Sequence, residues 1–340
     1  VKELVDNLLC AFQKHFASAS FPVLQPAIAV GSAFEGWSPC GDHAVYRLLV
    51  PLKPPHGYRF QMNLCKTEQK LGYKQVRNFH ICVEHECTCR KEQLCENELC
   101  FLHCTEEELR QNQGPRLLSS LCTGSYLDVH KGAFWLQRLV KACWPTLPQL
   151  ANWHLEMLPS RHSCRFQVTS DNEEPWNIEL LLGVQQGNSD IFLSSMDTTS
   201  AASASTPSTM WVESCAVAEM KFFMHVARLV PHGSCHLKCL CIASLMFSDT
   251  GLSEYTIKTV VMHLLTIMPL SCWCSGDLLL RLHDIMRYLH YCMEEKHLNH
   301  FFFGNETLPD DIILPLGFQK AQLLNLFQHL VQDPAAYAKA

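Results

Sequence analysis

The sequence has no apolar run long enough to cross a lipid bilayer, and it opens without the basic and apolar segments of a secretory signal peptide. It also has no dense block of lysine and arginine. The formal net charge is −6, which argues against a protein that grips a nucleic-acid backbone. The chain begins at Val1 without methionine and ends at Ala340 without a clear stop. We therefore expect a segment of a longer protein whose targeting signals lie elsewhere.

The composition is that of a globular protein, with 48% hydrophobic and 18% charged residues among 340, enough for two packed domains. The cysteine count is 19, an odd number in a long chain, which is unlike a small disulfide scaffold. Several of these cysteines, such as Cys143 and Cys241, stand at apolar positions where a free thiol packs as a small hydrophobe. We expect reduced thiols in a reducing compartment.

Residues 80–104 contain six cysteines and three histidines, which admits two interpretations. One is a zinc site. The other is a set of thiols without metal, and the spacing favours it, because structural zinc ligands usually stand two to four residues apart on a tight turn. Cys87 and Cys89 have one residue between them. We expect no bound metal.

A Gly-Ser turn between two predicted strands is the first candidate for chemistry. The apolar residues 27–30 lead into Gly31-Ser32, and a second apolar run covers residues 44–52. Glycine allows a tight bend close to a ligand, and turn amides can point at an anion. An ordinary loop is the alternative interpretation.

The first 194 residues alternate between strand and helix patterns. Asp128 is placed to cap a helix. We expect helices over residues 2–16 and 130–144, and strands over 58–64, 78–83, 154–158, 165–169, 176–184 and 191–193.

From residue 210 onward the spacing of apolar residues predicts helices only. The segment 195–209 is rich in serine, threonine and alanine and is expected to be a flexible loop. We therefore predict an α+β chain with a mixed-sheet domain over 1–194 and an all-helical domain over 210–340. The predicted helices cover residues 212–230, 235–247, 254–268, 277–298 and 319–331.

Several stretches together resemble a known family. They are Val30–Trp37 with Val45–Leu52, Leu121–Val129, Trp176–Val184 with Asp190–Phe192, and His236–Leu240 with Leu252–Tyr255. They are similar to the inositol trisphosphate receptor-interacting protein-like family. That family belongs to the Mab-type nucleotidyltransferase-fold group, whose enzymatic relative is cyclic GMP–AMP synthase.

The resemblance implies a nucleotidyltransferase-like domain, including an N-terminal helix, followed by a helical domain. It implies one membrane span before this segment, with the domain on the cytosolic side. It also implies an interaction module that modulates a calcium-release channel or a signalling receptor. The expected partner is a protein, either the inositol trisphosphate receptor or a membrane receptor chain, with no nucleic acid and no cofactor. The alternative is a metal-dependent nucleotidyltransferase or a nucleotide-sensing protein.

The alternative needs carboxylates for two Mg²⁺ ions, with two acids spaced two apart on the strand after the turn. Residues 41–47 contain no such pair. Asp42 is alone beside His43, and Glu179 is the best third acid. We predict a pseudoenzyme with no catalytic residue. The candidates for its degenerate pocket are Gly31, Ser32, Glu35, Asp42, His43, Arg47, Glu179 and Lys238.

Overall fold

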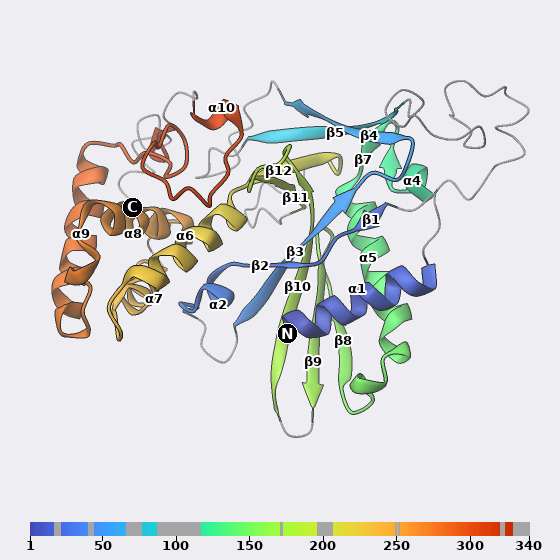
Figure 1. The fold of residues 1–340 in the computed structure, drawn as a ribbon, viewed down its shortest axis with the longest axis horizontal. Helices are drawn as coiled ribbons and strands as arrows, with labels where there is room; N and C mark the ends of the chain where they lie inside the picture. The colour runs from blue at the N-terminus through green and yellow to red at the C-terminus, as the bar shows by residue number, and fades with distance from the viewer. Residues whose placement is uncertain are drawn as a thin grey trace, which may run out of the picture.

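The computed structural model shows a mixed sheet in the middle of the molecule, with the helices of the C-terminal half gathered at one end (Figure 1). The predicted α+β class, a mixed sheet followed by helices, is confirmed. The residues that the structure describes are 1–16, 22–39, 44–65, 77–86, 117–170, 173–195, 207–248, 250, 252–319 and 324–328.

The strands of the sheet follow the order β1-β3-β10-β11-β12-β5-β7-β6. In addition, β2 pairs with β3, and β4 pairs with β5. Strand β8 pairs with β9, and β9 pairs with β10. Pairing between β3 and β10 is parallel, and the other strand pairs are antiparallel. The strands are β1 (Val23–Leu24), β2 (Ile28–Val30), β3 (Val45–Lys53), β4 (Tyr58–Leu64), β5 (Asn78–His85), β6 (Cys122–Thr123), β7 (Tyr126–Leu127), β8 (His154–Leu158), β9 (Cys164–Ser170), β10 (Glu173–Gln185), β11 (Phe192–Ser194) and β12 (Met210–Ser214).

The central strands β3 and β10 are buried over their apolar runs, which suits strands covered on both faces. Their register fixes the surroundings of one carboxylate. Glu179 on β10 lies opposite Arg47 on β3 and opposite Arg165 on β9. Val30, the last residue of β2, also pairs with Arg47, so the Gly-Ser turn begins beside the same arginine.

Helices α1 and α5 pack together against the sheet, where the rings of Phe12 and Trp135 meet edge to face with centroids 5.9 Å apart. The longer helices of the C-terminal half share a second core. The helices are α1 (Lys2–Phe16), α2 (Ser32–Glu35), α4 (Leu117–Ser120), α5 (Val129–Cys143), α6 (Ala216–Leu229), α7 (His236–Met246), α8 (Glu254–Ile267), α9 (Leu278–Glu294) and α10 (Leu316–Gln319). None of these helices is both long and apolar enough to span a membrane, among the residues that the structure describes.

The predicted helix over residues 212–230 is wrong at its start, because β12 occupies residues 210–214 and α6 begins only at Ala216. The strand forms because Trp211 is fully buried in the sheet core, where its indole N–H donates to the Leu127 carbonyl at 2.9 Å. The sheet therefore continues past the predicted domain boundary at residue 210.

The predicted helix over residues 319–331 is wrong at residues 324–327, whereas Gln319 is the last residue of α10. Asn325 makes an isolated bridge to Asn299, and its side-chain oxygen accepts from the amides of Leu298 and Phe327. These bonds replace the backbone bonds of a helix. They hold the segment against the turn after α9.

The two halves share apolar contacts, because Trp37 and Ile191 from the first half lie in the core of the helical half. The division into domains at 1–194 and 210–340 stays a prediction. Residues 196–206 of the predicted loop lie outside the described residues, as do all but Cys82, His80 and His85 of the cysteine–histidine cluster.

Asp128 caps α5 as predicted, and the cap joins three segments. Its carboxylate accepts hydrogen bonds from the Lys131 amide (3.1 Å), Thr123 Oγ1 (2.7 Å) and Ser208 Oγ (2.6 Å). Burial opposes its charge, but these bonds outweigh burial and hold the pKa of Asp128 below its ordinary value. The cap therefore ties the start of α5 to β6 and to the segment before β12.

We expect Asp128→Ala to lower the free energy of unfolding by about 2 kcal/mol, because one cap bond and two side-chain bonds are lost. Urea unfolding at neutral pH measures this loss. Asp128→Asn keeps an acceptor oxygen and should lose clearly less. Equal stability of Asp128→Ala and the unaltered chain would show that the cap does not contribute to the free energy of unfolding.

Candidate functional site

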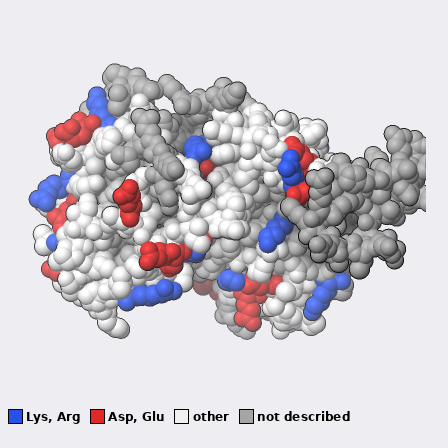
Figure 2. All heavy atoms as spheres, turned by 45° about the horizontal axis from the view of Figure 1, so that its top comes forward, with Lys and Arg blue, Asp and Glu red and all other residues white. Residues whose placement is uncertain are grey.

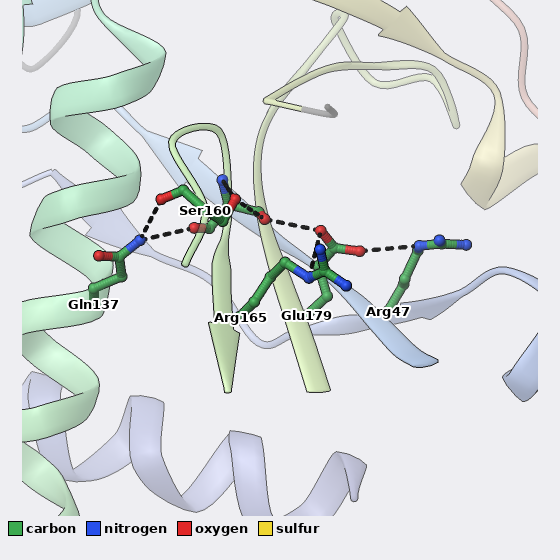
Figure 3. Close-up of polar contacts among 6 residues, drawn as sticks. Arg47, Gln137, Ser160, Arg165 and Glu179 are labelled. Carbon is green, nitrogen blue, oxygen red and sulfur yellow. Dashed lines mark hydrogen bonds and ion pairs between the residues drawn. The ribbon is translucent and has the colours of Figure 1, made fainter. Parts of the chain in front are cut away.

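Glu179 is the centre of the candidate site, and its carboxylate is held by two arginines and a serine (Figure 3). Arg47 Nε donates to Oε2 at 3.1 Å. Ser163 Oγ donates to Oε1 at 2.8 Å, and Arg165 Nε lies 3.8 Å from the same oxygen. The carboxylate itself is nearly buried, with Glu179 7% exposed. Its negative charge is therefore matched by the side chains on both neighbouring strands.

The network continues from Glu179 to α5 through the turn between β8 and β9 (Figure 3). Ser163 Oγ shares a hydrogen bond with Ser160 Oγ at 2.8 Å. Gln137 on α5 donates from Nε2 to the carbonyls of Ser160 and Ser163, each at 3.0 Å. Glu179 is thus fixed from three elements, which makes it a rigid part of the sheet.

This arrangement works against binding of Mg²⁺ at Glu179. A hard cation needs carboxylate oxygens that are free to coordinate it, in near-octahedral geometry. Here both oxygens already accept hydrogen bonds, and two guanidinium groups would repel an arriving cation. The geometry fits an ion pair that holds β3, β9 and β10 together.

The Gly-Ser turn lies beside this ion pair. Gly31 has φ +83°, a left-handed conformation that glycine adopts readily, and it precedes the first residue of α2. A Cβ placed on Gly31 would lie 3.9 Å from Arg47 Cβ. The N-cap position of α2 is occupied by Gly31, and Ser32 is the first residue of the helix. The structure therefore places Gly31 against Arg47, which pairs with Glu179, and Ser32 follows Gly31 in the chain.

Glu35 belongs to a different constellation. Its carboxylate accepts from Trp37 Nε1 at 2.6 Å and from Lys258 Nζ at 2.7 Å. Lys258 also donates to Glu219, so one ammonium on α8 joins α2 to α6. We call Glu35, Lys258 and Glu219 the buried ion triad, since all three residues are at least nine-tenths buried.

Charge and burial compete within the buried ion triad. Burial raises the pKa of Glu35, and the nearby Lys258 acts in the opposite direction. Burial also opposes the charge of Lys258, but Glu219 and Glu35 outweigh it and raise the pKa of this ammonium above its ordinary value. The triad therefore depends on the lysine remaining charged and in place.

Sequence reasoning missed Lys258 and Glu219, although a signal was present. Lys258 stands within an otherwise apolar stretch of a predicted helix, and Glu219 stands between Ala218 and Met220 on another. A charged residue on the buried face of a helix requires a partner of opposite charge. The sequence does not show which of these charges pair, because the three residues of the buried ion triad are far apart along the chain.

The remaining predicted candidates are Lys238, Asp42 and His43. Lys238 is exposed on α7 in the helical half. Asp42 and His43 lie outside the described residues. In the described part of the chain, no group of three or more histidine, cysteine, aspartate or glutamate side chains could hold a metal ion. A small pocket between α1 and α5 is lined by Leu8, Leu9, Phe12, Leu136, Leu139, Val140, Cys143 and Leu180.

Comparison with known proteins gives the family context of this geometry. Residues 239–332 match the Mab-21 protein HhH/H2TH-like domain. The chain is 32% identical to inositol 1,4,5-trisphosphate receptor-interacting protein-like 1 of Rattus norvegicus, over all of this chain and 62% of the relative. It is 30% identical to inositol 1,4,5-trisphosphate receptor-interacting protein of Homo sapiens, over 98% of this chain and 64% of the relative.

The chain thus spans a little under two thirds of the length of these curated relatives. The match nevertheless runs through every described element, including the strands that carry Glu179 and both arginines. The resemblance inferred from the sequence is confirmed: this chain is a homologue of the inositol trisphosphate receptor-interacting proteins, and its residues 239–332 match the Mab-21 protein HhH/H2TH-like domain.

Proposed function

We propose that this chain is a protein-interaction domain built on a nucleotidyltransferase-like fold that performs no nucleotidyl transfer. The observation that carries the proposal is that the Glu179 carboxylate is already held by hydrogen bonds and ion pairs. Its two oxygens are engaged by Arg47, Ser163 and Arg165, where an enzyme of this fold would need them for metal ions. A metal-dependent transferase or a nucleotide sensor would have to release this carboxylate first.

The proposed partner is the inositol trisphosphate receptor, in keeping with the names of the relatives. On the face shown in Figure 2, basic and acidic side chains of the described residues are interspersed. A surface of mixed charge suits a protein partner better than a nucleic-acid backbone. A membrane tether outside this segment, with the domain on the cytosolic side, is also part of the proposal and rests on the resemblance.

Binding to the receptor tests the proposed partner. The purified chain is immobilised and exposed to increasing concentrations of detergent-solubilised inositol trisphosphate receptor. We expect saturable binding that an excess of free chain abolishes. The same surface carrying heat-unfolded chain is the matched control. Binding that never saturates, or that equals the control, would contradict the proposed partner.

Glu179→Gln should lower the free energy of unfolding by about 1 kcal/mol or less. The two arginine side chains are 40% and 41% exposed, so water replaces much of their interaction with the carboxylate. Glutamine keeps an oxygen that accepts from Ser163. Glu179→Leu removes this acceptor and should cost more. Urea unfolding of the two variants measures the difference, and a larger loss in the glutamine variant would contradict the structural role.

A further inference from the structure

Two histidines from distant parts of the sequence face each other at the start of α5. His130 is the second residue of that helix, and His162 lies in the turn between β8 and β9. Their Nε2 atoms are 3.2 Å apart. The rings meet edge to face, with centroids 4.7 Å apart and an angle of 75° between planes.

Both histidines stand on firmly held backbone. The turn that carries His162 is clamped to α5 by Gln137, which donates to the carbonyls of Ser160 and Ser163 on either side. The backbone next to His130 is fixed by the Asp128 cap, whose carboxylate accepts from the amide of Lys131, the residue that follows His130. The two imidazoles are therefore preorganised, which lowers the entropic cost of binding a ligand between them.

We propose that His130 and His162 form a binding site for a divalent transition-metal cation, with their two Nε2 atoms as ligands and water completing the coordination shell. Two nitrogens each about 2.1 Å from a tetrahedral metal ion lie about 3.4 Å apart. The observed separation of 3.2 Å is close to this value. Imidazole suits zinc, copper and nickel, whereas Mg²⁺ prefers oxygen ligands.

Binding requires a change of tautomer but no oxidant or other reactant. Without metal, one ring donates its Nε2 hydrogen to the Nε2 of the other. With metal, both rings carry their hydrogen on Nδ1, and each Nε2 offers a lone pair. No proton leaves the neutral pair overall.

The charges around the pair are mixed. Burial and the neighbouring His162 lower the pKa of His130. The Asp128 carboxylate favours a cation here, and Arg161 opposes it. Sequence spacing does not reveal this pair, because His130 and His162 are 32 residues apart. Only the fold brings them together.

Calorimetric titration with NiCl₂ under reducing conditions tests the site on the folded chain. His130→Gln and His162→Gln each remove one ligand, and His154→Gln replaces an exposed histidine of β8 as the matched control. Thiols are present in all variants, so their contribution cancels in the comparison. We expect the unaltered chain and His154→Gln to share a binding step that is at least about tenfold weaker in both other variants.

The double variant His130→Gln/His162→Gln should lose no more than either single variant, because both ligands serve one ion. Superimposable titrations of all variants would overturn the proposal, since any nickel would then sit elsewhere. Loss in only one of the two single variants would overturn it as well. If one substitution disturbs folding, the other still decides, because the two residues stand on different elements.

Discussion

Lys258→Met is expected to lower the free energy of unfolding by about 3–5 kcal/mol, the cost of leaving buried charges without a partner. Methionine fills a similar volume but supplies no charge. Glu35 and Glu219 would then be two buried carboxylates without the lysine between them, and Trp37 Nε1 would still donate to Glu35. The loss should be large because the triad joins α2 of the sheet half to α6 and α8 of the helical half.

Urea unfolding of Lys258→Met measures this loss, with Lys238→Met as the control for replacing a lysine by methionine on an exposed helix surface. The control should change stability by less than about 0.5 kcal/mol. Adding Glu35→Gln and Glu219→Gln to Lys258→Met should recover part of the loss, because no buried charge then lacks a partner. A Lys258→Met variant as stable as the control would show that the triad does not stabilise the folded chain.

Acidification from pH 6.5 to pH 4 is expected to destabilise the folded chain through His300, by about 1.4 kcal/mol for each pH unit. Burial lowers the pKa of His300 to about 3, and the neighbouring His263 adds to this effect. The neutral ring is held on both sides: Nδ1 accepts from the Phe302 amide at 3.2 Å, and Nε2 contacts Tyr255 Oη at 2.8 Å. The folded state therefore resists protonation of this ring.

The sign of this pH dependence follows from which state of the chain, folded or unfolded, binds the proton at the higher pH. The unfolded chain takes up a proton at His300 near pH 6.5, whereas the folded chain does so only near pH 3. Stability from this residue is thus fully present above pH 6.5 and is lost as the pH falls toward 3. Burial lowers the pKa of His236 and His263 as well, so they add losses of the same sign.

Urea unfolding between pH 7 and pH 4 isolates the contribution of His300 when the unaltered chain is compared with His300→Gln. The glutamine variant should start less stable and depend less steeply on pH. His283→Gln, which replaces an exposed histidine of α9, is the control and should keep the slope of the unaltered chain. Equal slopes in all three proteins would contradict a neutral, buried His300.

Much of the sheet could be predicted from the sequence because its strands are short apolar runs between turn residues. The segments now seen as β3, β4, β5 and β10 were all expected, and so was the cap at Asp128. β12 was missed because residues 210–214 run without a break into the apolar pattern of α6. Periodicity alone cannot separate a short buried strand from the first turn of a buried helix.

The candidate site was predictable only in part. Arg47 and Glu179 come from recognisable strands, but Arg165 became their neighbour only through the register of β9 on β10, which sequence patterns do not reveal. Glu35 is predicted to share the degenerate pocket with Glu179. The buried face of α2 instead directs it toward Lys258.

Incubation of the purified chain with nucleoside triphosphates and Mg²⁺ or Mn²⁺ tests the non-catalytic proposal most directly. Nucleotidyl transfer develops negative charge that metal ions must neutralise, and the carboxylate that should help to bind them is paired with Arg47 and Arg165. We expect no phosphodiester product above a blank without protein. A metal-dependent product that disappears in Glu179→Gln would contradict the proposal and identify the chain as a working nucleotidyltransferase.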